Sequence, residues 1–372
     1  MRMSSSFLLL IALLFASDQS QCAIHHPQTA IPHKPLVLKN WGLDNTEQKS
    51  HIDIRDAWKI TKGSKKIIVA VIDTGIDANH PDLKDNIWHK PGTNEYGFDF
   101  YTNQKNPIDQ HGHGTHVAGI IGATGKANLG ASGVAPNISI MAVRYYSENA
   151  TGQENLNNTI KAINYAIDNG ANIINYSGGG AEFSAAEMKA IQRAEEKGIL
   201  VVAAAGNEYQ NTDDAGNAYY PAAYGLSNII AVAATNIRNQ LLPSSNWGKK
   251  HVNVAAPGEN IYSTLPNGRY GYLTGTSQAT AFVSGLAALI LSENPNLKPP
   301  EVRRIIMNSV DKFESLERKI ASSGRINAYA ALREVDLEKH NRNHISVGSR
   351  EKSHALVAKK DGKSHKRDVA FE

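Results

Sequence analysis

Cysteine is nearly absent from this chain of 372 residues, because Cys22 is the only one. A lone cysteine excludes an internal disulfide, and with it the class of small secreted domains held together by disulfides. Long apolar runs are missing too. A membrane-spanning helix needs about 18 or more consecutive apolar residues, and the N-terminal apolar run from Phe7 to Ala16 is far shorter. We therefore expect neither a disulfide framework nor a stable membrane anchor.

The apolar run near the N-terminus follows one early positive charge, Arg2. A charged start followed by a short apolar core is typical of a secretory signal peptide, here residues 1–23, with cleavage after Ala16 or Ala23. A buried N-terminal helix is the alternative. Polar residues precede Cys22, whereas a lipidation site needs small apolar ones, so we expect no lipid anchor. The sequence thus predicts a secreted or periplasmic protein.

Charge of one sign gathers only at the C-terminal end. With 41% apolar and 20% charged residues, the chain has enough apolar material for a sizeable core. Residues 339–372 carry nine Lys and Arg against four Asp and Glu, while the whole chain has a net charge of +4. We expect a short leader at 24–40, one large domain at 41–334 and a flexible basic tail at 335–372. Polyanion binding by the tail is the alternative.

Runs of consecutive apolar, often β-branched residues recur along the chain, as expected of buried parallel strands. Helical patterns lie between them, and Gly170 and Gly198 follow two of these where a C-terminal cap belongs. The alternation predicts an α/β fold, a doubly wound, mostly parallel β-sheet flanked by helices. The strand runs cover residues 67–72, 138–143, 171–175, 199–204 and 229–234, and the helical patterns cover 156–167 and 185–196.

Polar residues stand at the ends of these elements, where the functional groups of a parallel sheet gather. Asp73 closes the first strong strand, Asn207 follows a later one, and His113 and Ser277 head helices. A serine in the first turn of a buried helix lies beside unpaired N–H groups that stabilise a developing anion, although such a serine is more often only a cap. A nucleophilic serine needs a base, and the base needs an orienting carboxylate. His113 and Asp73 supply both, which predicts acyl transfer.

The motifs around these residues are Asp-Thr-Gly at 73–75, His-Gly-Thr-His at 113–116, Ala-Gly-Asn at 205–207 and Gly-Thr-Ser at 275–277. In this order and spacing they resemble the subtilisin-like serine proteases, or subtilases, and the resemblance extends from about residue 41 to 332. It implies a subtilisin-like fold and an exported serine endopeptidase without a catalytic cofactor. Its expected partners are polypeptide substrates and not nucleic acid, and we expect a monomer.

The resemblance also implies a role for each residue. Ser277 attacks the scissile carbonyl, His113 carries the proton, and Asp73 orients His113. The side chain of Asn207 joins the backbone N–H of Ser277 in an oxyanion hole. Two departures from the common family pattern occur in the serine motif, where Gln278 replaces Met and Ala281 replaces Pro. Neither position supplies one of the catalytic groups.

Two other classes of hydrolase share parts of these motifs. Asp-Thr-Gly is also the signature of aspartic proteases, which need two such loops in one site, and no second one occurs here. His111, His113 and His116 have a spacing that suggests a metal site, but similar metallo-hydrolases usually carry Asp where this chain has Thr115. We interpret His111 and His116 as structural or surface residues.

Residues for substrate binding are predicted on both sides of the reactive serine. Ser177, Gly178 and Gly179 end a strand, and glycines there allow an extended peptide to pair with the backbone. By the resemblance, Tyr219 lies near the floor of the primary specificity pocket, which predicts a restricted pocket or one floored by an aromatic ring.

A structural calcium ion is a further expectation from the resemblance. The segment at 77–83 matches a family segment whose last aspartate helps to bind calcium, so Asp82 is a candidate ligand, with loop carbonyls around Asn128 as companions. An ordinary surface aspartate is the alternative for Asp82. Two alternatives also exist for the function, namely a catalytically silent relative that binds peptides and an amidase or esterase that uses the same triad.

Overall fold

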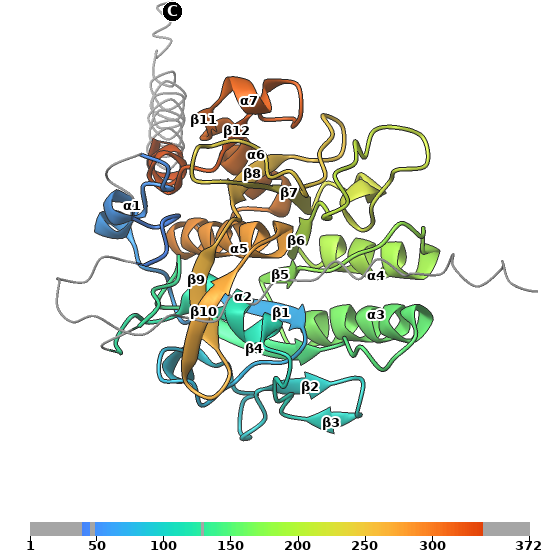
Figure 1. Cartoon of the computed structure of the whole chain (residues 1–372). Coiled ribbons are helices and arrows are strands. Elements are labelled where there is room, and N and C mark those ends of the chain that lie inside the picture. Colours follow the sequence, from blue (N-terminus) through green and yellow to red (C-terminus); the bar gives the residue numbers. More distant parts are fainter. Residues whose placement is uncertain (1–38, 45–48, 128–129, 338–372) are drawn as a thin grey trace, which may run out of the picture.

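A computed structural model describes residues 39–44, 49–127 and 130–337 of the chain (Figure 1). The predicted signal peptide, nearly all of the leader and most of the basic tail lie outside the described residues, so these remain predictions. Within the described part, none of the helices combines the length and the apolar character that crossing a membrane requires.

Two sheets form the β-structure. The smaller one is an antiparallel hairpin of β9 (Ile261–Leu265) and β10 (Arg269–Leu273). The larger one contains β1 (Ile68–Asp73), β2 (Gly97–Asp99), β3 (Gln104–Lys105), β4 (Ser139–Arg144), β5 (Ile173–Tyr176), β6 (Leu200–Ala204), β7 (Ile229–Thr235), β8 (Val254–Pro257), β11 (Asp311–Lys312) and β12 (Gly324–Arg325). Its order is β11-β12-β8-β7-β6-β5-β1-β4-β2-β3, and only the outermost pairs, β11–β12 and β2–β3, are antiparallel.

Helices cover both faces of the large sheet (Figure 1). Sequence signals fix where some of them begin: α3 starts behind a capping box formed by Thr151 and Glu154, and the Ser184 side chain caps α4. The α-helices are α1 (Ile54–Ile60), α2 (His113–Gly122), α3 (Gly152–Asp168), α4 (Ala185–Glu196), α5 (Thr276–Glu293), α6 (Pro299–Asn308) and α7 (Glu314–Glu317), and the 3₁₀ helices are η1 (Lys84–Asn86) and η2 (Ala222–Tyr224).

The central strands are buried on both faces, which explains their continuous apolar sequence. Along β1, Val69 and Val71 belong to one hydrophobic cluster with residues of α2 and α5. Ala70 and Ile72 belong to another cluster with residues of α3 and α4. Since alternate residues of a strand point to opposite faces, each side of the sheet has its own core. The predicted doubly wound, mostly parallel α/β fold is confirmed.

The five strand runs predicted from the sequence correspond to β1, β4, β5, β6 and β7, within one or two residues at each end. Gly170 and Gly198 have φ values of 76° and 71° just after α3 and α4, as expected of C-terminal caps. Several elements were not predicted, among them β8 and the two strands of the hairpin. The hairpin strands carry three tyrosines and several polar residues, so they lack the continuous apolar pattern on which the prediction depended.

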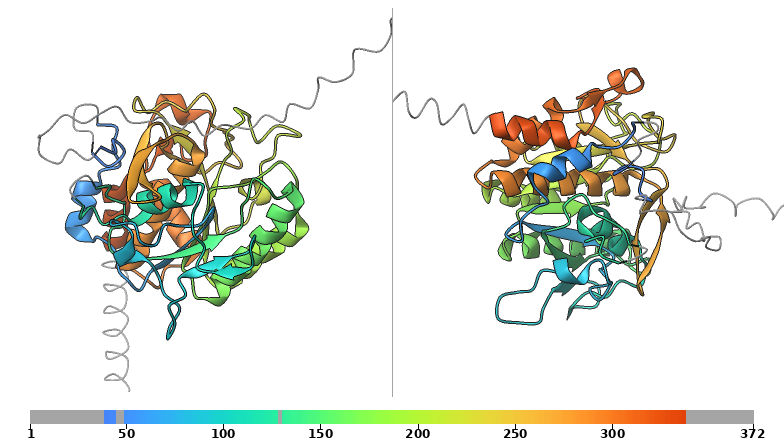
Figure 2. Two further views of the ribbon diagram at one scale, coloured as in Figure 1. Left: turned by 60° about the horizontal axis from the view of Figure 1, so that its bottom comes forward. Right: turned by 90° about the vertical axis from the view of Figure 1, so that its left-hand side faces the viewer.

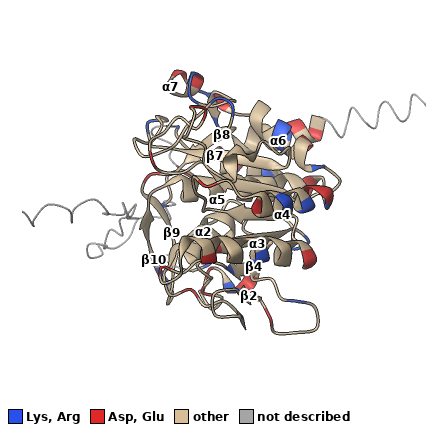
Figure 3. Cartoon of the chain, turned by 90° about the vertical axis from the view of Figure 1, so that its right-hand side faces the viewer, with Lys and Arg blue, Asp and Glu red and all other residues tan. Residues whose placement is uncertain are grey.

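Helix α5, which carries Ser277, is almost entirely buried. All its residues from Thr276 to Leu291 are buried, and it packs against β5, β6, β7, β8 and α2. Figure 3 shows that Lys, Arg, Asp and Glu lie mainly on the outer helices and loops, whereas α5 is almost entirely free of them. Its single charged residue is Glu293 at the last position. The predicted nucleophile therefore stands at the end of a core element.

The first and last described segments lie side by side (Figure 2). Asn327 donates its Nδ2 to Asp53 Oδ2 over 2.6 Å, and the backbone N–H of Ala328 donates to the carbonyl of Ile52 over 2.7 Å. These bonds connect the entry to α1 with the start of a helical segment at 328–337. They close the described chain on itself, on the side of the sheet that α5 covers.

Candidate active site

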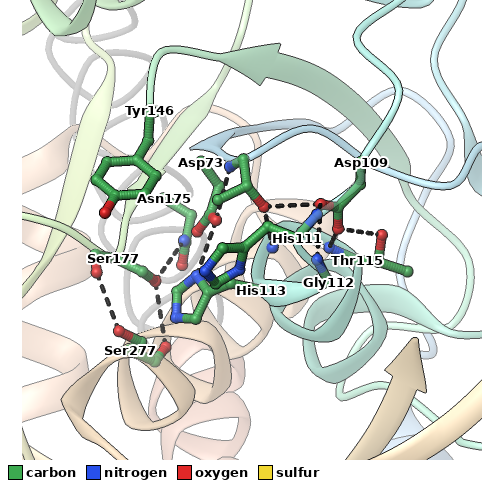
Figure 4. A network of polar contacts seen from close by, with 12 residues as sticks. Asp73, Asp109, His111, Gly112, His113, Thr115, Tyr146, Asn175, Ser177 and Ser277 are labelled. Carbon is green, nitrogen blue, oxygen red and sulfur yellow. Dashed lines mark hydrogen bonds and ion pairs between the residues drawn. The ribbon is translucent and has the colours of Figure 1, made fainter. Parts of the chain in front are cut away.

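The topology brings the predicted site residues to one edge of the sheet. Strands β6, β5 and β1 are neighbours and run parallel. Asp73 is the last residue of β1, Ser177 directly follows β5, and Asn207 lies three residues after β6. His113 is the first residue of α2, and Ser277 is the second of α5. The carboxyl ends of three adjacent strands and the N-termini of two helices thus meet at the site (Figure 4).

Asp73 and His113 form a short hydrogen bond. The Nδ1 atom of His113 lies 2.8 Å from Asp73 Oδ1, and the backbone N–H of Thr74 donates to the same oxygen over 2.8 Å. An ionised carboxylate can only accept, so Nδ1 carries the proton in this bond. The lone pair of Nε2 is then free on the opposite side of the ring, which is the side on which a general base must act.

The environment of His113 stabilises its protonated form. Burial alone lowers the pKa of His113, but the charge of Asp73, the hydrogen bond to Asp73 and the charge of Asp109 outweigh this effect and raise it above the ordinary 6.5. The imidazole keeps a solvent-exposed fraction of 17%, whereas the side chain of Asp73 keeps 5%. A histidine with a raised pKa is a stronger base and accepts a proton readily near neutral pH.

Ser277 lies close to this pair but is hydrogen-bonded elsewhere. Its Oγ donates to the carbonyl of Ser177 over 3.0 Å, and Ser177 Oγ donates to the carbonyl of Ser277 over 3.2 Å. Ser277 and His113 both belong to the described residues, and they form no hydrogen bond with each other in this arrangement. Figure 4 shows the His113 ring between Asp73 and Ser277. Rotation about the Cα–Cβ bond of Ser277 redirects the hydroxyl, and such bonds often tighten only when substrate is bound.

Asn207 is oriented by the start of α5. Its Oδ1 accepts hydrogen bonds from the backbone N–H of Thr276, over 2.9 Å, and from Thr276 Oγ1, over 3.1 Å. Both bonds use the carbonyl end of the amide, so the Nδ2 group remains as a donor. It forms no bond to another residue in the part of the chain that the structure describes. A fixed amide donor beside a helix N-terminus is the arrangement that stabilises an oxyanion.

Asp109 belongs to the site but was not predicted. It lies four residues before His113, has an exposed fraction of 4%, and accepts hydrogen bonds from Thr74 and from the first turn of α2. An acidic residue shortly before a helix can accept from its free N–H groups and favours the positive end of the helix dipole, and this signal could have found the residue. The motif His-Gly-Thr-His at 113–116 indicates the histidines as candidates and does not include Asp109.

The ring of Tyr219, one of the predicted substrate-binding residues, packs against the backbones of Gly179 and Gly206. A side-chain carbon added at Gly179 would overlap this ring, and one added at Gly206 would lie 3.0 Å from it. Gly180 and Tyr220 exchange two backbone hydrogen bonds of 3.0 and 2.7 Å, which hold the segment in place. The Tyr219 ring therefore fills the space between two backbone segments, one at Gly179 just after Ser177 and one at Gly206 just before Asn207.

The histidines flanking His113 have different environments. His111 is exposed, and its ring centroid lies 6.3 Å from that of His113. His116 is buried, and its Nε2 lies 3.0 Å from the carbonyl of Ile261 in the hairpin. Burial, and then the charge of His113, lower the pKa of His116 to about 3, so His116 is neutral at ordinary pH. Among the described residues, no group of three or more His, Cys, Asp or Glu side chains could hold a metal ion.

Asp82, the candidate calcium ligand, is fully buried and saturated with hydrogen-bond donors. Its Oδ1 accepts from the backbone N–H groups of Lys126 and Ala127 over 2.9 and 3.0 Å. Its Oδ2 accepts from the N–H of Ala131, over 3.0 Å, and from Tyr270 Oη, over 2.8 Å. Hydrogen atoms that point at both oxygens oppose a cation there, so this donor set does not fit calcium. Asn128 lies outside the described residues.

Comparison with known proteins gives consistent matches along most of the chain. Residues 64–348 match the model of the subtilase family. A thermophilic serine proteinase from Bacillus sp. (strain AK1) is 41% identical over 291 residues, covering 78% of this chain and 67% of that protein. Thermitase from Thermoactinomyces vulgaris is 39% identical over 76% of this chain and 93% of its own length. Subtilisin-like protease 2 from Plasmodium falciparum is 35% identical, but the chain spans only 24% of that protein.

Proposed function

Since this chain belongs to the subtilase family and is a serine-type endopeptidase, we propose that Asp73, His113 and Ser277 are its catalytic triad. Asn207 supplies an oxyanion donor in this proposal. The observation that carries it is the 2.8 Å contact between Asp73 and His113, which leaves Nε2 of the ring free on the side of Ser277. An exported enzyme follows from the signal peptide predicted at residues 1–23.

The proposed reaction has two halves. Ser277 Oγ attacks the carbonyl carbon of the scissile peptide bond while His113 Nε2 takes the hydroxyl proton. The negative charge that forms on the carbonyl oxygen is stabilised by Asn207 Nδ2 and by N–H groups at the start of α5. His113 then gives its proton to the leaving amine as the C–N bond breaks. Water, activated by the same histidine, hydrolyses the ester bond to Ser277 in the second half.

A fluorophosphonate probe tests the nucleophile directly, because it labels only an activated serine. The protein from about residue 17 onward should be labelled, with the adduct on Ser277, and a Ser277→Ala variant of the same fold should not. Labelling together with cleavage of a protein substrate supports the endopeptidase. Folded protein that binds peptides without being labelled would establish the silent alternative, and turnover of small esters alone would establish the esterase.

We also propose that Tyr219 restricts the acyl-side residue of the substrate to a small side chain. Its ring lies against Gly179 and Gly206, beside the residues that contact the scissile bond. Burial, followed by the charges of Glu208 and Glu187, raises the pKa of Tyr219, so the phenol is neutral under working conditions. A neutral ring in this space leaves no room for a bulky substrate side chain, and it provides no negative charge to attract a basic one.

Peptide substrates that differ only in the acyl-side residue test this preference. We expect kcat/KM to be higher for Ala than for Phe, and Tyr219→Ala to improve Phe relative to Ala by about 10-fold or more, since each methylene of pocket space contributes about 10–200-fold. The matched control is Tyr209→Ala, because Tyr209 is an exposed tyrosine in the loop after Asn207, with an exposed fraction of 62%. Equal turnover of Ala and Phe by the wild type would refute the restriction.

A further inference from the structure

We propose that Asp109 is a positioning residue, which fixes the loop of Asp73 and the helix of His113 relative to each other. It touches neither the substrate nor the reacting atoms in this proposal. It acts through Thr74 and Thr115, one on each of the two segments. The inference rests on the proposed function, because the geometry it maintains is that of the triad.

Every donor around the Asp109 carboxylate comes from one of these two segments or from the turn between them (Figure 4). Oδ1 accepts from Thr74 Oγ1, over 3.0 Å, and from the backbone N–H groups of His111 and Gly112, over 3.0 and 2.8 Å. Oδ2 accepts from the backbone N–H of Thr115, over 2.9 Å, and from its Oγ1, over 2.6 Å. One buried carboxylate thus holds five donors.

The two threonines extend these bonds across the interface between loop and helix. Thr74 Oγ1, which donates to Asp109, also accepts from the backbone N–H of Gly114 over 2.9 Å. Thr115 Oγ1, which likewise donates to Asp109, accepts from the backbone N–H of Asp77 over 3.0 Å. The loop at 73–77 is therefore bonded to the first turn of α2 at two points, and Asp109 orients both hydroxyl groups.

The backbones at this interface are in direct contact. A side-chain carbon on Gly114 would lie 2.2 Å from the carbonyl oxygen of Gly75 and 3.1 Å from Cβ of Asp73. Gly75 has φ of 106°, a conformation that favours glycine, and a side-chain carbon there would lie 2.9 Å from the carbonyl oxygen of Pro107. With no space between the segments, a change in the hydrogen bonds shifts the distance from Asp73 to His113 directly.

Asp109 also contributes its charge to the surroundings of His113. The titratable groups that face His113 are Asp73 from β1, Asp109 from the turn before α2, and His111 and His116 from the turn and the helix itself. A negative charge at the N-terminus of α2 offsets the positive end of the helix dipole. Its removal should lower the pKa of His113, whereas loss of packing alone should not.

The test compares Asp109→Asn with Asp82→Asn. Asp82 is an equally buried, hydrogen-bonded aspartate with no bond to the catalytic residues, so it is the matched control for a general loss of stability. Active sites are titrated with the fluorophosphonate probe, and kcat and KM are measured per titrated site across the pH range. Turnover by the wild type is established first, since its absence would refute the proposed function rather than the role of Asp109.

We expect Asp109→Asn to lower kcat by about 10–100-fold with little change in KM, because misplacing a reacting group by about 1 Å costs about 10²-fold. The acid limb of its kcat/KM profile should move to lower pH, while that of Asp82→Asn stays with the wild type. Unchanged kcat and acid limb in Asp109→Asn, or an equal shift in Asp82→Asn, would overturn the proposal.

A second pair of variants keeps the test decisive if Asp109→Asn does not fold. Thr74→Val removes the hydroxyl that connects Asp109 to the loop and preserves the shape of the side chain, whereas Thr74→Ser retains the hydroxyl. The proposal requires a larger fall in kcat for Thr74→Val than for Thr74→Ser. Equal kcat values for the two variants would refute it.

Discussion

Asp73 and Asp82 are buried aspartates only nine positions apart, and yet the donors around them differ. Asp73 accepts hydrogen bonds from the Thr74 backbone and from His113, a side chain that titrates. Among the described residues, Asp82 accepts only from groups that stay neutral at ordinary pH, namely backbone N–H groups and the hydroxyls of Thr124 and Tyr270. Burial is therefore not the property that distinguishes a catalytic carboxylate from a structural one. Between these two residues, the distinguishing property is whether a hydrogen-bond partner can change its charge.

The two residues also differ in what they hold together. Asp73 orients one ring on α2, close to the reactive serine. Asp82 connects residues 124–127 and Ala131 with Tyr270 in β10, which is 188 positions further along the chain. The contribution of Asp82 should thus appear in the free energy of unfolding, and that of Asp73 in the rate of reaction. Variants at and around both residues separate these effects.

The largest expected effect is that of Asp73→Asn on catalysis. An amide at this position no longer stabilises the imidazolium and favours the wrong ring tautomer, which lowers kcat by about 10⁴-fold in enzymes with such a triad. Active-site titration and kcat measurement check this effect, and circular dichroism checks the fold. A kcat within tenfold of the wild type would contradict the assignment of Asp73.

Tyr270→Phe should affect stability rather than catalysis. The substitution removes one hydrogen bond to a buried carboxylate, which costs about 1–3 kcal/mol, and the partial exposure of Tyr270 favours the lower end. Urea unfolding measures the loss, and kcat per titrated site should equal that of the wild type. A fall in kcat without a fall in stability would mean that Asp82, like Asp73, contributes to the reaction rate.

Gln278→Met should stabilise the protein. Gln278 is fully buried beside Ser277, and both polar atoms of its amide lack a partner among the described residues. Beside Asp73 and Asp82, Gln278 is thus a third kind of buried polar residue, one whose side chain has no hydrogen-bond partner among the described residues. Because an unsatisfied buried group costs about 1–3 kcal/mol, an apolar side chain of similar length should increase the free energy of unfolding by about 1 kcal/mol or more. Gln278→Glu, which retains the polarity, should not do so.

Removal of calcium should have the smallest effect. Since N–H and O–H groups already point at both oxygens of Asp82, we expect the same unfolding temperature in chelator and in millimolar calcium. The measurement is a thermal melt with Ser277→Ala, which avoids self-digestion. A calcium-dependent rise in Ser277→Ala that disappears when Asp82→Asn is added would instead support the calcium site predicted at Asp82 and Asn128.

Much of the architecture could be predicted because its signals are local. The run at 67–72 and the observed strand Ile68–Asp73 differ by one residue, and His113 begins a helix as expected. The distant partners of Asp109 and Asp82 could not be predicted in this way. Thr74 is 35 positions from Asp109, and Tyr270 is 188 positions from Asp82, so only the folded chain brings these donors to the carboxylates.

Gln278 shows that the absence of a hydrogen-bond partner is also a property that the sequence does not reveal. Its departure from the family pattern was visible in the sequence, but its energetic consequence was not. That consequence depends on an exposed fraction of 0% and on the absence of a partner among the described residues, and both are properties of packing.

The burial of α5 has a consequence for how the enzyme loses activity. Amide hydrogens in a helix that contacts the central strands exchange with solvent only when the whole cooperative unit opens. Ser277 stands in the first turn of that helix, so local opening of the exposed loops leaves it in place. Inactivation by heat should then coincide with global unfolding, and each molecule should be either fully active or unfolded.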